Sequence, residues 1–396
     1  MKIVDILPRE RLIGKVIGQP VFRDAINHGG TLVTWEYTEI LTDEEISGFI
    51  PTGFSSDDLS AIKPVIIGSD PLQIQKIWHH LYWQFFNQGR SRGMMRAISW
   101  IDIGLWDIIG KKLNTPVYKL LGGYRERVPG YGSGGVLSLT NDDLVKEQMS
   151  WVNEGFRAVK MKVGRKNWRE DLERVKAVRD AIGVSIDLMV DANNGWSVAT
   201  AIRVANRLER YEVNWLEEPV LAEDYSGYQQ VRSATEIPIA GGESEYTKWG
   251  FKELFTRNCI DIVQADVGRV GGITEYMKVG GMAEAFNLPM CPHGAGVVSA
   301  HCVAAASNGM IVEFFDGNRL PNTTLRKFQE ETGKRFMPDS ARPVNGWIEL
   351  PKVPGLGFNP DLDAIKRYKD QYQFNEAALS VRRTLPPVNN NLFHSL

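Results

Sequence analysis

Short apolar segments alternate with longer amphipathic ones through the middle of the chain. Eight short segments rich in apolar residues lie at 128–134, 157–163, 186–192, 213–218, 237–243, 261–266, 288–293 and 310–315. Between them, as in 168–183 and 198–211, apolar residues recur every three or four positions among many charges, which indicates amphipathic helices. Eight strands that alternate with helices predict a TIM-type (β/α)8 barrel of the α/β class, because a doubly wound open sheet usually has fewer strands.

The flanks of this repeat have a different pattern. Residues 32–41 alternate as a strand does, whereas 94–113 carry apolar residues at helical spacing. We therefore predict an α+β capping domain over residues 1–125 and the catalytic barrel over 126–345. The remaining segment, 346–396, is rich in turn residues and ends in a polar stretch, and we expect it to return to the capping domain.

Composition narrows the class of protein. With 396 residues, 43% of them hydrophobic and 24% charged, the chain has the balance of a folded globular protein. A net charge of -2 provides neither the basic field that binds nucleic acid nor a polybasic membrane anchor. Three cysteines predict no disulfide framework, and the charged first residues do not resemble a signal peptide. We predict a cytoplasmic protein whose partner is a small molecule.

Acidic residues end three successive predicted strands. Asp191 ends the third strand, Glu217 the fourth, and Glu243 the fifth. Neighbouring strands stand about 5 Å apart, so carboxylates at their ends can converge on one point. Three buried anions would repel one another without a cation, and hard oxygen ligands favour one Mg²⁺. The alternative is that one or two of these acids pair with arginines of the barrel or with the capping domain.

Two lysines end the second predicted strand. Lys160 and Lys162 are two residues apart, so their side chains point to the same side of the strand, toward the barrel mouth. We expect their mutual repulsion and partial burial to lower a lysine pKa toward neutrality, which would make it a base. The alternative is a solvated pair of lysines on an edge strand.

A second acid/base pair is predicted at the following strands. Asp266 ends the sixth strand and His293 the seventh, opposite Lys162. A neighbouring carboxylate can accept the imidazole proton, fix the tautomer and raise the basicity of the histidine. Glu313 ends the eighth strand, and in its protonated form it would donate a hydrogen bond to developing charge.

A cation between two bases defines a type of reaction. A carboxylate substrate on Mg²⁺ has an acidified α-proton, and one base removes it to give an enediolate. The other base then returns a proton, which racemises or epimerises the substrate, or it protonates a departing β-hydroxyl, which dehydrates it. A lysine Schiff-base aldolase and a barrel that only binds carboxylates remain as alternatives.

The same residues resemble the enolase superfamily and, within it, the mandelate racemase subgroup of the mandelate racemase/muconate lactonizing enzyme family. The marks of that subgroup are a KxK motif, three metal-binding acids and a His/Asp dyad on successive strands, and all of them are present here. The resemblance implies that Glu313 contacts the substrate carboxylate. It also implies that Asn193, Lys160 and Ser133 lie near other carboxylate or metal contacts, and that the protein is a homo-oligomer, a tetramer or octamer.

Family members place two capping-domain loops over the barrel mouth, where they set specificity. The matching stretches are 21–30 and 51–56, and the polar residues that we expect to contact substrate are Arg23, Asp24, Asn27, His28 and Arg90. Polar partners favour a substrate with several hydroxyls. We therefore predict dehydration of an acid sugar to a 2-keto-3-deoxy acid, with Lys162 or His293 as the α-proton base and the other as general acid. Racemisation or epimerisation of a 2-hydroxy acid at the same site is the main alternative.

Overall fold

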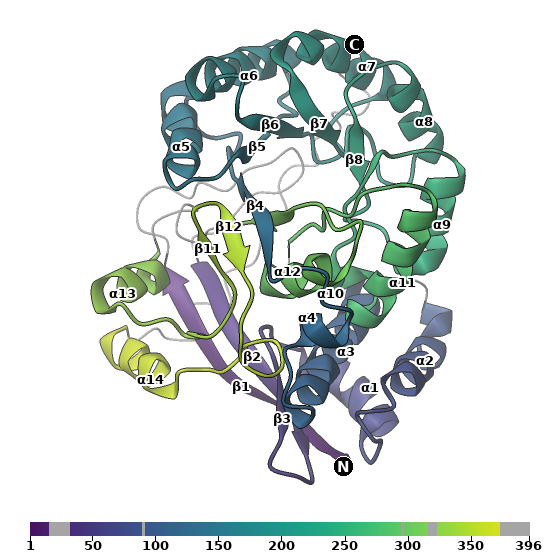
Figure 1. Cartoon of the computed structure of the whole chain (residues 1–396), viewed down its shortest axis with the longest axis vertical. Coiled ribbons are helices and arrows are strands. Elements are labelled where there is room, and N and C mark those ends of the chain that lie inside the picture. The colour runs from purple at the N-terminus through teal and green to yellow at the C-terminus, as the bar shows by residue number, and fades with distance from the viewer. Residues whose placement is uncertain (16–31, 89–91, 295, 316–322, 373–396) are drawn as a thin grey trace.

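The computed structural model describes five stretches of the chain, residues 1–15, 32–88, 92–294, 296–315 and 323–372 (Figure 1). In the described stretches, no helix combines the length and the apolar character needed to cross a membrane.

The N-terminal part is an antiparallel sheet with helices against it. The strands β1 (Ile3–Lys15), β2 (Leu32–Thr42) and β3 (Ser47–Ile50) pair in that order. The helices that follow are α1 (Ser56–Ile66), α2 (Ile74–Gln84), η1 (Phe86–Gln88), α3 (Arg92–Lys112) and α4 (Val117–Leu120). Buried aliphatic side chains of α1, α2 and α3 form one core with those of the sheet. The α+β cap predicted from the sequence is therefore confirmed.

Parallel strands of the barrel follow the cap. They are β4 (Arg127–Ser133), β5 (Ala158–Lys162), β6 (Asp187–Asp191), β7 (Val213–Glu217), β8 (Ile239–Gly241), β9 (Ile262–Val263) and β10 (Val312–Phe314). Each strand from β4 to β9 pairs with the next, and β10 returns to pair with β4. At the seventh predicted position, Met290 forms only isolated bridges to Val263 and Gly309. Prolines 289 and 292 flank this position and lack the N–H group that a ladder needs, which explains the short pairing.

Helices surround these strands (Figure 1). They are α5 (Asn141–Asn153), α6 (Trp168–Ile182), α7 (Val198–Leu208), η2 (Glu209–Tyr211), α8 (Tyr225–Ser233), α9 (Thr247–Thr256), α10 (Val267–Val270), α11 (Gly272–Ala285) and α12 (Gly296–Ala305). Several begin at a residue whose side chain accepts a hydrogen bond from the first turn, as Thr140 does for α5 and Ser197 for α7. The alternation of strands and helices gives the barrel architecture that the sequence predicted.

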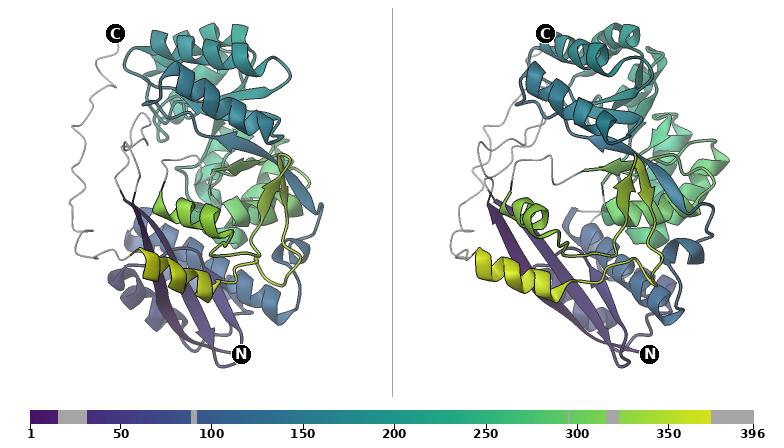
Figure 2. Two further views of the ribbon diagram at one scale, coloured as in Figure 1. Left: turned by 90° about the vertical axis from the view of Figure 1, so that its left-hand side faces the viewer. Right: turned by 60° about the vertical axis from the view of Figure 1, so that its left-hand side comes forward.

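The last described segment alternates between barrel and cap. It contains α13 (Thr324–Thr332), β11 (Arg342–Val344), β12 (Trp347–Glu349) and α14 (Leu362–Gln371). Figure 2 shows α13 and α14 beside β1, where the Lys15 amide donates to Thr324 Oγ1 and the Tyr368 hydroxyl donates to the Ile13 carbonyl. β12 pairs with β4 of the barrel. The chain thus returns to the cap, with a first contact at Thr324, while the domain boundaries remain a prediction.

An apolar layer inside the barrel supports the strand ends. Tyr131, Met189, Trp215 and Cys291 are buried there and pack in one cluster. Met189 and Trp215 each precede a strand-end acid by two residues and therefore lie on the same face of the strand as that acid. Along each of these strands, an apolar layer inside the barrel is thus followed by a charged layer at the strand end. The charged layer lies at the carboxyl ends of the strands, where the chemistry of such barrels is placed.

Candidate active site

The three strand-end acids converge as predicted. Asp191 and Glu217 end β6 and β7 and pair in register, and Glu243 follows β8 by two residues. One carboxylate oxygen from each lies within 4.8 Å of the others, and all three side chains are buried. Oε2 of Glu243 accepts no hydrogen bond from the described residues, so this oxygen remains available to a ligand. Oxygen donors crowded in this way suit a hard divalent cation such as Mg²⁺.

The two lysines of β5 are buried against these acids. Lys160 Nζ lies 2.7 Å from Glu217 Oε1 and 2.8 Å from Glu313 Oε1. Lys162 Nζ lies 2.5 Å from Asp191 Oδ2. Side-chain exposures of 1% and 5% show that the alternative of a solvated pair on an edge strand is wrong.

The expected lowering of a lysine pKa is also wrong for this arrangement. Burial by itself lowers the pKa of Lys160, but the charges of Glu217, Glu313 and Asp191 outweigh it and raise the pKa well above its usual value. Burial likewise opposes the charge of Lys162, and attraction to Asp191 raises its pKa despite repulsion from Lys160. The two ammonium groups are neighbours in the sequence, whereas the carboxylates of the next strands come close to them only in the fold. A divalent cation among these acids would offset part of their field.

His293 and Asp266 form the predicted dyad. His293 Nδ1 lies 2.8 Å from Asp266 Oδ2, while Nε2 lies 3.4 Å from Glu243 Oε2. Burial lowers the pKa of His293, but the charge of Glu243 and the hydrogen bond with Asp266 outweigh it and raise the pKa to about 9. Lys162 contacts Asp191 and His293 lies beside Glu243, so the two bases stand at different ends of the acid triad.

Glu313 differs from its predicted state. The sequence left open a protonated carboxyl group that donates a hydrogen bond. Burial would raise its pKa, but the positive charges of Lys160, His293 and Lys162 lower the pKa far below its usual value. Its Oε2 accepts the Gly294 amide at 2.9 Å. Glu313 is therefore an ionised acceptor that links β5 to the loop carrying His293.

Ser133 and Asn193, expected near the substrate, lie at adjoining strand ends. Ser133 pairs with Lys160 in the β4–β5 register. The Asn193 amide donates to Asp191 Oδ1 at 2.8 Å. Ser133 Oγ and Asn193 Oδ1 are both buried without a hydrogen-bond partner among the described residues, which is the condition of groups that contact a ligand. Their roles remain predictions.

The residues predicted to set specificity all lie outside the described stretches. They are Arg23, Asp24, Asn27, His28 and Arg90. Within the second predicted loop, 51–56, Ser55 begins α1 as an N-cap in a reciprocal pair with Asp58.

The structure adds residues that the sequence analysis missed. Arg269, on α10, lies 3.0 Å from Asp266 Oδ2 through Nε and 3.1 Å from Glu243 Oε1 through Nη1. Gln264 Nε2 and Trp215 Nε1 donate to Glu217 Oε2 at 2.7 and 3.2 Å. Gln264 and Trp215 each precede a strand-end acid by two residues, so strand alternation could have found them.

Glu218 is a second overlooked acid. Its Oε2 accepts Asn194 Nδ2 at 2.6 Å, and its Oε1 has no hydrogen-bond partner among the described residues. Burial, followed by the charge of Glu243, raises the pKa of Glu218 well above its usual value. The sequence contains two adjacent acids, Glu217 and Glu218, at the end of this strand. We had assigned a role only to Glu217, although the second acid could also have been noted.

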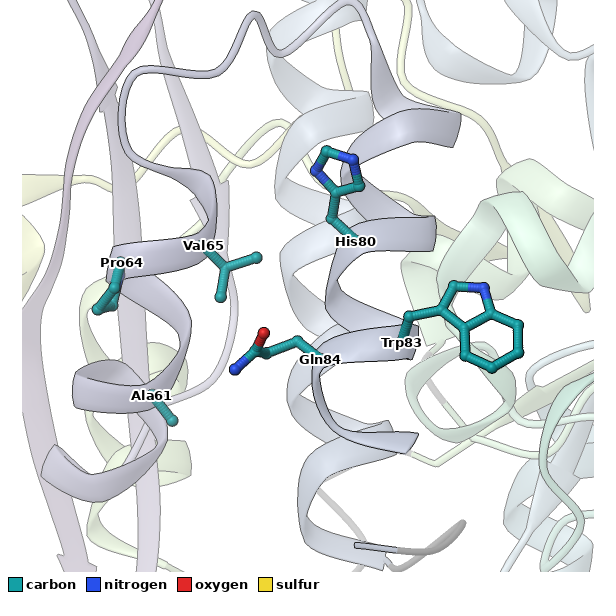
Figure 3. Close-up of a pocket in the computed structure, with 6 residues that line it drawn as sticks. All are labelled: Ala61, Pro64, Val65, His80, Trp83 and Gln84. Atoms are coloured by element: carbon teal, nitrogen blue, oxygen red, sulfur yellow. The ribbon is translucent and has the colours of Figure 1, made fainter. Parts of the chain in front are cut away.

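Two hollows of the described structure lie away from this cluster. One, of about 650 Å³, lies between α1 and α2 of the cap (Figure 3) and is lined by Ala61, Pro64, Val65, His80, Trp83 and Gln84. The other, of about 390 Å³, opens among the N-terminal ends of β5, β6 and β7 and under β12. Neither lining contains a residue of the acid triad or of the dyad.

A barrel with three convergent acids, two buried lysines and a histidine–aspartate dyad at its strand ends defines a class of metal-dependent enzymes that act on carboxylates. Comparison with known families agrees with this class. Residues 143–364 match the family described as "Enolase C-terminal domain-like", and residues 50–122 match the "Mandelate racemase / muconate lactonizing enzyme, N-terminal domain". The chain belongs to the mandelate racemase/muconate lactonizing enzyme family.

Several relatives have names that describe their activity. The chain is 35% identical over 314 residues to the arabinonate dehydratase of Saccharolobus solfataricus, which covers 78% of this chain and 81% of the relative. It is 32% identical over 342 residues to the 3,6-anhydro-alpha-L-galactonate cycloisomerase of Streptomyces coelicolor, covering 86% and 85%. The solved L-talarate/galactarate dehydratase of Salmonella typhimurium, with Mg and L-lyxarohydroxamate, is 30% identical, covers 92% of each chain and superposes with a TM-score of 0.79.

Proposed function

We propose that this protein is a Mg²⁺-dependent hydro-lyase that dehydrates an acid sugar to a 2-keto-3-deoxy acid. The observation that carries the proposal is the acid triad Asp191, Glu217 and Glu243, with Lys162 at one end and the His293–Asp266 dyad at the other. Among its relatives are acid-sugar dehydratases, one of them solved with Mg²⁺.

The three acids are the residues that would hold the metal. Their close approach and Glu243 Oε2, which accepts no hydrogen bond from the described residues, fit a divalent cation. When bound, Mg²⁺ supplies Lewis-acid stabilisation of negative charge on the substrate carboxylate. Lys160, fixed between Glu217 and Glu313, places a further positive charge in the same space. We assign Lys160, Ser133 and Asn193 to substrate binding, because each is buried at a strand end next to the triad.

The two bases divide the proton transfers. Whichever of Lys162 and His293 is neutral takes the α-proton, and the electron pair of the C–H bond moves into the carboxylate to form an enediolate. The other gives a proton to the β-hydroxyl, the C–O bond breaks, and water leaves. The resulting enol becomes the 2-keto acid. The configuration at the α-carbon decides which base acts first, because each lies toward a different end of the triad.

Asp266 and Glu313 hold neighbouring groups of the site in place without transferring the substrate proton. Asp266 orients the imidazole through Nδ1 and stabilises its protonated form. Glu313 holds Lys160 and the Gly294 amide in place. Both are acceptors fixed by several donors, which is the arrangement that keeps a catalytic group in one orientation.

A substrate screen tests the proposal. The protein with Mg²⁺ is incubated with a library of mono- and diacid sugars, and 2-keto acids are detected, with Lys162→Ala and His293→Asn as inactive controls. The same library in D2O reports exchange of the α-proton. Exchange without a keto product would support the racemase or epimerase alternative. Inactivity toward every acid sugar, with exchange on a simple hydroxy acid, would refute dehydration.

Borohydride trapping addresses the aldolase alternative. A Schiff base on Lys160 or Lys162 would leave a covalent adduct after reduction, whereas metal-dependent elimination would leave none and would stop on chelation. We also propose that the protein is a cytoplasmic homo-oligomer, a tetramer or octamer. Light scattering of the purified protein measures the number of subunits.

A further inference from the structure

The segment that follows the dyad aspartate makes a sharp turn against the cap. Asp266 is the N-cap of α10, and its Oδ1 accepts the Gly268 amide at 2.7 Å. α10 lasts one turn and ends at Gly271 and Gly272, whose φ angles are +124° and +82°. These conformations favour glycine, and they redirect the chain into α11.

Cap side chains hold the first half of this turn. The Trp78 indole N–H donates to the Gly271 carbonyl at 2.7 Å. The Gly271 amide donates to Ser99 Oγ at 2.9 Å. Trp78 belongs to α2 and Ser99 to α3, so two cap helices hold the two backbone groups of one barrel residue. Both side chains are buried, which makes loss of either partner costly.

Two further side chains of α3 hold the second half. Asp102 Oδ2 accepts the Thr274 amide at 2.9 Å. The Trp106 indole N–H donates to Thr274 Oγ1 at 3.0 Å. A Cβ atom on Gly272 would collide with the Asp102 carboxylate, so α3 lies in direct contact with the backbone of the turn. We call Trp78, Ser99, Asp102 and Trp106 the cap clasp.

The short helix α10 connects the turn held by the cap clasp to Asp266 of the proposed dyad. Arg269 on α10 contacts Asp266 Oδ2 and Glu243 Oε1. Asp266 Oδ2 is the atom that faces His293 Nδ1. The ring of Trp100, also on α3, lies against Gly268 so closely that an added Cβ would be 3.0 Å from it. A displacement of the turn would therefore move the residues that orient the histidine.

We propose that the cap clasp is a set of positioning residues for the His293–Asp266 dyad, so that the cap contributes to proton transfer from outside the barrel. This inference rests on the proposed function, because it assigns the dyad to that reaction. The clasp residues touch no reacting atom. They act through the Gly271–Thr274 turn and α10, where a displacement of about 1 Å can cost on the order of 100-fold in rate.

Two buried aspartates of α3 provide a matched comparison. Asp102 accepts a backbone amide of the turn, whereas Asp107 accepts the amides of Phe49 and Leu356, which lie away from α10. We expect Asp102→Ala to lower kcat about 10-fold or more with KM changed less than about twofold. Asp107→Ala should change kcat less than about twofold when assayed below its unfolding temperature. Equal effects of the two substitutions would show a merely structural role and overturn the proposal.

A double-mutant cycle shows whether Asp102 acts through Asp266. In an Asp266→Asn background, the kcat loss from Asp102→Ala should shrink to less than about twofold, because the group being positioned is already impaired. A full 10-fold loss in that background would contradict the inference. Trp106→Phe, which removes only the indole donor, provides a milder variant if Asp102→Ala does not fold. It should lower kcat by about threefold, and an unchanged kcat with faster hydrogen exchange at 266–275 would also contradict it.

Failure of the inference is distinguishable from failure of the proposed function. If Asp266→Asn leaves turnover unchanged, the dyad has no role and the proposed function is wrong. If Asp266→Asn lowers turnover but Asp102→Ala behaves as Asp107→Ala does, only the cap clasp is refuted.

Discussion

Asp107 in the cap and the acid triad in the barrel are both buried, but their carboxylates differ in their hydrogen-bond partners. Asp107 on α3 accepts the Leu356 amide through Oδ1 at 2.8 Å, and it accepts the Phe49 amide and Lys111 through Oδ2 at 2.9 and 2.6 Å. In the strand-end triad, three carboxylates approach within 4.8 Å, and Glu243 Oε2 accepts no hydrogen bond from the described residues. Both sites are buried, but Asp107 has a donor at each oxygen, whereas the triad leaves Glu243 Oε2 without one among the described residues.

This difference indicates a structural role for Asp107 and a ligand-binding role for the triad. Asp107 ties β3 and the segment around Leu356 to α3, and the chain itself supplies all its donors. The triad crowds three carboxylates beside Lys160, Lys162, His293 and Arg269, and a bound cation would reduce the repulsion among the carboxylates. What distinguishes the triad is that three buried carboxylates crowd together and that one of their oxygen atoms, Glu243 Oε2, accepts no hydrogen bond from the described residues.

The largest expected effect is on catalysis. Lys162→Ala or His293→Asn should lower kcat for the acid sugar found by the screen about 10³-fold, because each removes one of the two proton-transfer groups. Steady-state kinetics with Mg²⁺ measure the loss, and circular dichroism checks that the fold is retained. A variant that keeps more than about a tenth of wild-type kcat would remove that residue from the mechanism.

The next largest expected effect is on stability, and it tests the structural role of Asp107. Asp107→Ala should lower the free energy of unfolding by about 3 kcal/mol, because it leaves one buried amide, one part-buried amide and Lys111 without their acceptor. Urea denaturation measures the change. Asp107→Asn, which keeps one acceptor oxygen, should lose less, and an equal loss in both variants would mean that charge rather than hydrogen bonding dominates.

Metal binding tests the triad directly. Mg²⁺ at about 100 times its dissociation constant should raise the free energy of unfolding of the wild type by about 2.7 kcal/mol. Glu243→Gln should lose most of this gain, because a neutral amide is a weaker ligand for a hard cation. Thermal unfolding with Mg²⁺ or with a chelator measures it. Asp107→Ala is the control and should keep the full Mg²⁺ effect.

The smallest expected effect is on the pH dependence of stability, and it contrasts buried His301 with part-buried His293. Burial lowers the pKa of His301 to about 3, and its Nδ1 accepts the Tyr118 amide at 3.1 Å. Because the folded state binds fewer protons than the unfolded state between about pH 3 and 6.5, stability is lost as the pH falls through this window. Between pH 7 and pH 5 the loss from this group is about 2 kcal/mol.

His301→Gln checks that assignment, because glutamine can accept the same amide and does not titrate. Denaturant unfolding at pH 7 and pH 5 should show a smaller acid loss in the variant than in the wild type. An identical pH dependence in both proteins would mean that other groups govern acid unfolding. His293, whose pKa is raised to about 9, should not contribute to the loss in this window.

Much of the site could be predicted because it follows from strand alternation. Side chains at strand ends are ordered by the barrel, so Asp191, Glu217 and Glu243 could be placed together from their positions alone. Their strand-end positions likewise predicted the contact between Asp266 and His293. The seventh strand was placed correctly but is reduced to bridges at Met290, since its prolines remove ladder donors.

Protonation states could not be predicted in the same way. From the sequence we expected a lowered lysine pKa and considered a protonated Glu313. In the structure the pKa of Lys160 is raised and that of Glu313 is lowered. Each pKa depends on all charges within a few ångströms, and most of these come from other strands. Arg269 was missed for the same reason, because its importance lies in reaching Asp266 and Glu243 together.

The sequence by itself determined the barrel, the cap and the identity of the chemical groups, because period and strand-end position are local properties of the chain. Only the tertiary structure decided which groups are paired, which oxygens remain free and which cap residues hold the turn beyond Asp266. Those contacts join residues up to 193 positions apart, as Trp78 and Gly271 are, and Asp102 and Thr274 are 172 positions apart. No local pattern specifies such a pair, because its energy depends on the packing of two helices from different domains.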